Sequence, residues 1–100
     1  MRITTGHYST YRTTISGEEY FVNISASYPF TVYLGSYSFS LTISSIARQK
    51  PRNVQLKIGR REMHALVDKR SMSKESTRQM DMYALNKVKK DIAAGKIILR

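Results

Sequence analysis

The chain has 100 residues, of which 41% are hydrophobic and none is cysteine, and its formal net charge is +10. That length holds one domain with one modest core, and the absence of cysteine excludes disulfides and thiolate metal sites. The first residues contain no apolar signal-peptide region, and no apolar run approaches the roughly 20 residues of a membrane span. We therefore expect a single domain over residues 1–100, located in the cytoplasm and not in a membrane.

The charge is divided between a neutral half, residues 1–47, and a basic half, residues 48–100. The neutral half holds two arginines, two glutamates and nine of the ten aromatic residues. The basic half holds fifteen lysines and arginines against five acids, which accounts for the whole net charge. This division indicates a strand-rich scaffold followed by a segment that supplies the electrostatic field of the protein.

Alternating apolar and polar residues predict strands throughout the neutral half. A Thr-rich strand over Tyr8–Ile15 is followed by Ser16 and Gly17, which can turn the chain back onto a strand over Tyr20–Ala26. Short turns between such strands are typical of an antiparallel sheet with one face exposed to water.

The clearest alternation lies on either side of Gly35, over residues 30–34 and 37–43. Glycine at the first position of a two-residue loop suits a type II′ turn. That turn would pair Val32 with Phe39 and would place the apolar side chains of both strands on one face. We therefore predict a central hairpin here.

A last strand is predicted where Val54, Leu56 and Ile58 alternate with polar residues. The neutral half and this segment together predict an antiparallel meander of about five strands over roughly residues 2–58. The fold class is therefore α+β, provided that the remaining residues are helical.

After Gly59 the apolar residues recur with the spacing of a helix. We predict two C-terminal helices, over roughly residues 60–70 and 77–94, with the second opened by a capping box at Ser76 and ended by Gly95. The long second helix is expected to cover the inner face of the meander. A helix-turn-helix unit is disfavoured because the segment between the two helices exceeds the usual 3–4 residues.

The basic half predicts a surface for nucleic acid that binds through non-specific contacts to the phosphates of DNA or RNA. Its members are three side chains at an exposed hairpin tip, two arginines after the last strand, and three side chains on the second helix, including a tyrosine placed to stack on bases. These residues are Arg48, Lys50, Arg52, Arg60, Arg61, Tyr83, Lys87 and Lys90. Two alternatives remain open: a charged face that only keeps the protein soluble, and helix lysines that complement the helix dipole.

An uncharged row of side chains on the wet face of the sheet suggests a second function. It consists of Tyr33, Ser38, Ser40 and Thr42. Such a face could dock a larger protein or nucleoprotein complex, or could be covered by a second copy in a homodimer. The protein would then be a stoichiometric inhibitor or regulator of a nucleic-acid machine. Phage and plasmid anti-defence proteins such as anti-CRISPR proteins, and transcription modulators, act in this way.

No set of residues indicates catalysis. His64 and Asp68 are i, i+4 neighbours, a spacing that can hold a metal or orient a base, but no third ligand is evident. A helix surface pair is the simpler interpretation. The chain has neither a P-loop nor a glycine-rich dinucleotide motif. We expect a protein that is not an enzyme, with no cofactor and no metal.

Overall fold

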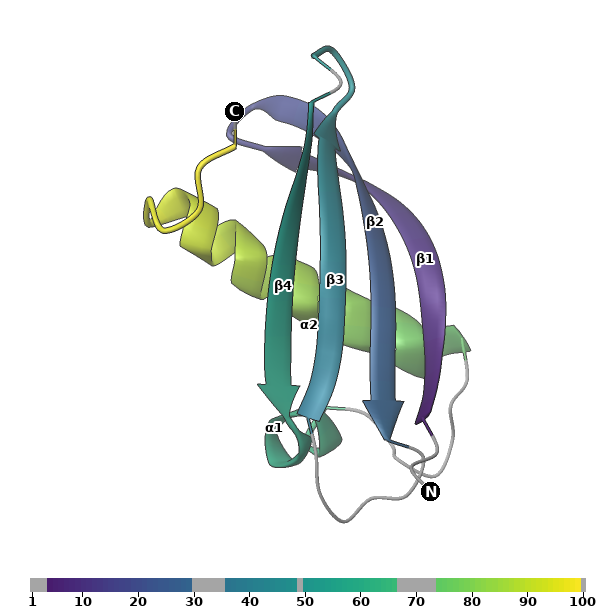
Figure 1. Cartoon of the computed structure of the whole chain (residues 1–100). Coiled ribbons are helices and arrows are strands. Elements are labelled where there is room, and N and C mark those ends of the chain that lie inside the picture. Colours follow the sequence, from purple (N-terminus) through teal and green to yellow (C-terminus); the bar gives the residue numbers. More distant parts are fainter. Residues whose placement is uncertain (1–3, 30–35, 49, 67–73, 100) are drawn as a thin grey trace.

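The computed structural model of the chain describes residues 4–29, 36–48, 50–66 and 74–99. These residues form an antiparallel sheet with the strand order β1-β2-β3-β4, followed by a short helix and a long one (Figure 1). The elements are β1 Thr4–Ile15, β2 Glu18–Pro29, β3 Ser36–Ser45, β4 Pro51–Gly59, α1 Arg60–His64 and α2 Lys74–Ala93. The α+β meander with a C-terminal helix is confirmed, but the described sheet has four strands and not the five predicted.

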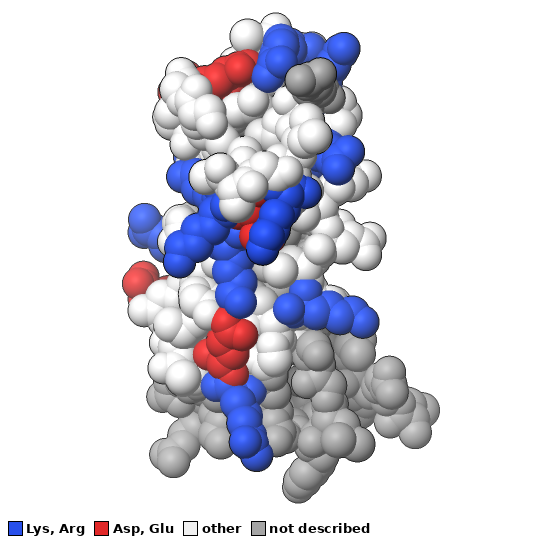
Figure 2. Space-filling view, turned by 90° about the vertical axis from the view of Figure 1, so that its left-hand side faces the viewer, with Lys and Arg blue, Asp and Glu red and all other residues white. Residues whose placement is uncertain are grey.

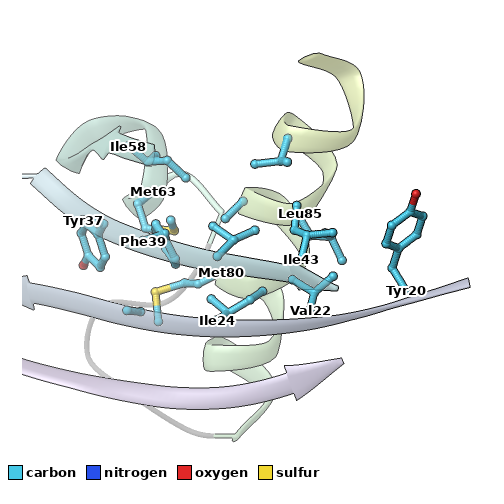
Figure 3. Close-up of a cluster of buried hydrophobic side chains, with 14 of the residues drawn as sticks. Tyr20, Val22, Ile24, Tyr37, Phe39, Ile43, Ile58, Met63, Met80 and Leu85 are labelled. Carbon is cyan, nitrogen blue, oxygen red and sulfur yellow. The ribbon is translucent and has the colours of Figure 1, made fainter. Parts of the chain in front are cut away.

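The long helix α2 crosses one face of the sheet, which we call the inner face (Figure 1). The core lies between the two (Figure 3). Alternate residues of each strand point into it, including Val22, Ile24 and Leu41, all 0% exposed. From the helix, Ala84 and Val88 close the core as the apolar stripe predicts. The prediction that the helix covers the inner face is therefore confirmed.

The β1–β2 hairpin closes with the two-residue turn that the sequence predicts. Ile15 pairs with Glu18, and the intervening Ser16 and Gly17 have φ values of 51° and 81°. Positive φ at both central positions is the requirement of a type I′ turn, whose twist matches that of the flanking strands. Glycine meets this requirement without cost, whereas serine meets it with some strain.

The predicted central hairpin around Gly35 is wrong in its pairing. In β3, Phe39 pairs with Ala26 of β2 on one side and with Leu56 of β4 on the other. A strand has only two edges, so Val32 cannot be its partner. The predicted strand over residues 30–34 lies outside the described residues.

Of the described residues in the first predicted helix, residues 60–70, only Arg60–His64 are helical. Its Met63 is fully buried, but Leu66, which the helical spacing places in the core, is 45% exposed. The end of the predicted helix, residues 67–70, lies outside the described residues. One turn of helix is therefore enough to bring Met63 under the sheet.

The second helix begins at Lys74, three residues before the predicted start. Ser76 consequently lies inside the first turn, where it is buried, and the predicted capping box is wrong. The predicted stop is confirmed, because Gly95 has a φ of 80°. The backbone N–H of Lys96 donates to the carbonyl of Asp91 at 2.8 Å, which completes a Schellman C-cap.

Candidate functional site

Lysine and arginine side chains gather on the side of the molecule formed by the β3–β4 turn, β4 and the second half of α2 (Figure 2). We call this the basic side. An open groove between β4 and α2 lies here. Its lining residues are Leu56, Tyr83, Asn86, Lys87, Lys89, Lys90, Asp91 and Ala93. Three of these eight side chains are lysines, so an anion in the groove would meet positive charge.

Arg48 of the β3–β4 turn is held by a network that fixes the turn to the sheet. Its guanidinium donates to both carboxylate oxygens of Glu18, at 3.2 and 3.0 Å, and to the hydroxyl of Tyr20 at 3.1 Å. Ser45 also donates to Glu18, and that hydrogen bond, followed by the charge of Arg48, lowers the pKa of the glutamate. Much of the charge of Arg48 is therefore neutralised within the protein.

Lys50 and Arg52 follow on the same turn and strand, and both are exposed. They line one small pocket together with Tyr20 and Leu99, which places them beside each other. Neither makes an ion pair with any residue that the structure describes. Of the three predicted tip residues, Lys50 and Arg52 therefore keep an unpaired charge among the described residues, whereas Arg48 does not.

On α2, Lys87 and Tyr83 are tied to Glu62 of α1. The Lys87 ammonium lies 2.8 Å from the Glu62 carboxylate, and the Tyr83 hydroxyl donates to the same oxygen. These hydrogen bonds, that of Lys87 first, lower the pKa of Glu62. Lys87 also lies 5.4 Å from the centre of the Tyr83 ring. Because the Tyr83 hydroxyl is held by Glu62 and its ring is only partly exposed, Tyr83 is a poor stacking site.

The remaining predicted residues are separated from the tip. Lys90 lies in the groove, but Arg61 lies on α1, at the opposite end of β4. The side chain of Arg60 is outside the described set. Two lysines that the prediction omitted, Lys57 and Lys89, also have no ion pair with a described residue. Both lie in the basic half of the sequence, and that position could have identified them as candidates.

The predicted docking residues Ser38, Ser40 and Thr42 lie on the outer face of the sheet, away from α2, and are partly exposed. Tyr33 lies outside the described residues. Thr42 donates to the side-chain oxygen of Asn53 at 2.7 Å, so the row continues onto β4. The outer face is therefore uncharged over much of its area.

A buried polar cluster joins β1 to α2, and the sequence interpretation missed it. Asp81 is 0% exposed. It lies 2.7 Å from the Nε2 atom of His7, and it accepts a hydrogen bond from the Tyr11 hydroxyl at 2.6 Å. Burial, and then the hydrogen bond to Asp81, raise the pKa of Tyr11 to about 12. Because the carboxylate is fully enclosed and contacts two residues of β1, the cluster acts as a clamp between strand and helix.

No family model, no curated protein and no solved structure matches the chain. Among the described residues, no group of His, Cys, Asp and Glu side chains is placed to hold a metal ion. The predicted pair of His64 and Asp68 lies outside the described side chains. Within the part that the structure covers, no helix is long and apolar enough to cross a membrane.

Proposed function

We propose that the chain is a non-enzymatic protein that binds nucleic acid by contacting its phosphates with the basic side. The observation that carries this proposal is a set of cations from three parts of the fold that share one side and have no ion pair with a described residue. The set is Lys50 before β4, Arg52 and Lys57 on β4, and Lys89 and Lys90 on α2. Unpaired cations keep their full attraction for a polyanion.

The dimensions of β4 suit this role. Its nine residues extend about 30 Å at ~3.3 Å per residue. One strand of a duplex advances about 3.4 Å per nucleotide, so the length of β4 equals roughly nine nucleotide steps. Of the residues predicted from the sequence, Arg48 and Lys87 contribute less, because Glu18 and Glu62 already pair with them.

The proposal is tested by comparing two arginine variants, Arg52→Gln on the basic side and Arg78→Gln on the first half of α2. Both side chains are exposed, and both changes remove one charge. We expect Arg52→Gln to weaken binding to a generic oligonucleotide and to flatten the log–log salt dependence by about 0.7–0.9, the value for one lost phosphate contact. Fluorescence anisotropy at several salt concentrations gives both quantities.

Arg78→Gln serves as the control for net charge and should leave the slope unchanged. Equal effects of the two variants would show that overall charge, and not this side of the molecule, drives binding. Failure of the unmodified protein to bind any oligonucleotide at low salt would contradict the proposal itself.

A second candidate function is protein-directed inhibition or regulation of a nucleic-acid machine. It is supported by the outer face, where Ser38, Ser40 and Thr42 carry no charge. Charged residues are depleted at the centres of protein interfaces, so this composition is compatible with docking. The basic side would then meet an acidic groove of the partner.

A further inference from the structure

We propose that the outer face of the sheet binds single-stranded nucleic acid, with bases stacking on Tyr8 and Phe21. This inference rests on the proposed function and names its ligand more narrowly. The bases would contact the outer face, and the phosphates would contact the cations around that face.

The first observation is the exposure of two aromatic rings on the same face. Tyr8 is 67% exposed and Phe21 is 44% exposed. Phe21 pairs with Arg12 across β1 and β2, and the Arg12 guanidinium, which also pairs with Glu19 at 2.6 Å, lies 6.0 Å from the centre of the Phe21 ring. An exposed ring beside an arginine is a surface on which a base of any identity can stack.

The second observation is an uncharged row of hydrogen-bonding side chains next to the rings. Its four residues come from the four strands in register: Thr10, Asn23, Thr42 and Asn53. Thr10 donates to the Asn23 side-chain oxygen at 2.9 Å, as Thr42 does to Asn53. Because the amide oxygens accept these bonds, the amide N–H groups of both asparagines remain without a partner in the described part of the chain. They can donate to base acceptors.

The spacing of the two rings fits a single strand. Tyr8 lies four residues before Arg12, the partner of Phe21, so the rings are about 13 Å apart along the strands at ~3.3 Å per residue. The row of Thr10 and Asn23 lies between them. A short run of unpaired nucleotides reaches both rings, whereas a duplex keeps the faces of its bases stacked inside. Lys57 on the same face, and Lys50 and Arg52 along the β4 edge, are available for phosphates.

The experiment measures the affinity of the purified protein for a 12-nucleotide single strand of thymidines and for a duplex of the same length. We expect tighter binding of the single strand. Tyr8→Ala and Phe21→Ala should each weaken it about 5- to 150-fold, the range for loss of one stacked base, and should change duplex affinity much less. Leu66→Ala, which truncates an exposed apolar side chain beside α1, is the matched control and should have no effect. Thermal melting verifies that each variant is folded.

A conservative variant separates stacking from general damage. Tyr8→Trp should keep the affinity for the single strand, and the emission of this tryptophan, the only one in the variant, should be quenched by the oligonucleotide. Equal single-strand and duplex affinities that neither alanine variant changes would overturn the inference and leave the proposed function intact. Absence of binding to both oligonucleotides would overturn both. A dimer that the alanine variants dissociate, with oligonucleotide affinity unchanged, would assign this face to a second copy.

Discussion

At the scale of single residues, the most informative group is the carboxylate of Asp81, which is buried between β1 and α2. A buried carboxylate is costly unless it is hydrogen-bonded, and His7 and Tyr11 both contact it. The sequence contains a signal for this cluster, because Asp81 shares the helical spacing of Ala84, Leu85 and the rest of the buried stripe. The partners could not be predicted, since they lie 74 and 70 residues away in the sequence.

The contact between Tyr11 and Asp81 predicts how the stability of the protein changes in alkali. The pKa of Tyr11 is about 12 in the folded protein against an ordinary value of 10.0. Between these values the folded state keeps a proton that the unfolded state releases, so the free energy of unfolding falls as the pH rises from about 10 to about 12. Tyr11→Phe should remove part of this dependence, and should cost about 1–2 kcal/mol at neutral pH through the lost hydrogen bond.

Urea unfolding at several pH values from 7 to 12 measures both effects. Burial also raises the pKa of Tyr37, and the hydrogen bond to Glu62, followed by burial, raises the pKa of Tyr83, so some alkaline dependence should remain in the variant. An identical slope in the two proteins would show that Tyr11 titrates normally and that its contact with Asp81 contributes little.

At the scale of elements, the alternation of residues identified most strands but not all of their neighbours. A period of two tells which face a side chain occupies, and it is the same whichever strand lies alongside. Phe39 points inward as predicted, yet it pairs with Ala26 and not with Val32, because β2 and β4 occupy the two edges of β3. The turn at Ser16 was predictable because its residue types and the length of its loop agree.

That turn provides a prediction of its own. Gly17→Val places a β-branched residue at a φ of 81°, which should destabilise the protein by about 1–2 kcal/mol. No atom lies within 4 Å of the added Cβ, so the cost is conformational and does not come from a clash. Gly59→Ala is the control, since its added Cβ also meets no atom and its φ is −62°. Similar losses of thermal stability in both variants would mean that the β1–β2 turn is not type I′.

At the scale of the whole molecule, the fold separates charge from uncharged polarity. The sheet and α2 bury one apolar layer, most unpaired cations lie along β4 and the end of α2, and the outer face carries mainly hydroxyl and amide groups. The composition gives the net charge, and the order of the residues shows that the charged segment comes after most of the strands in the sequence. Only the three-dimensional structure separates Arg48 and Lys87, which acids already pair, from Lys50 and Lys89, because ion pairs join residues that are distant in sequence.

The arrangement of the whole molecule predicts opposite effects of a new cation on the outer face for the two candidate functions. Ser40→Arg places a positive charge at the centre of that face. If single-stranded nucleic acid lies there, the variant should bind a thymidine 12-mer more tightly at low salt, with a log–log salt slope steeper by about 0.7. If a protein docks there, an arginine without a partner would be buried in the interface at a cost of several kcal/mol. Ser40→Gln adds comparable bulk without charge and is the control for crowding. Weaker oligonucleotide binding by Ser40→Arg but not by Ser40→Gln would contradict a nucleic-acid ligand on this face.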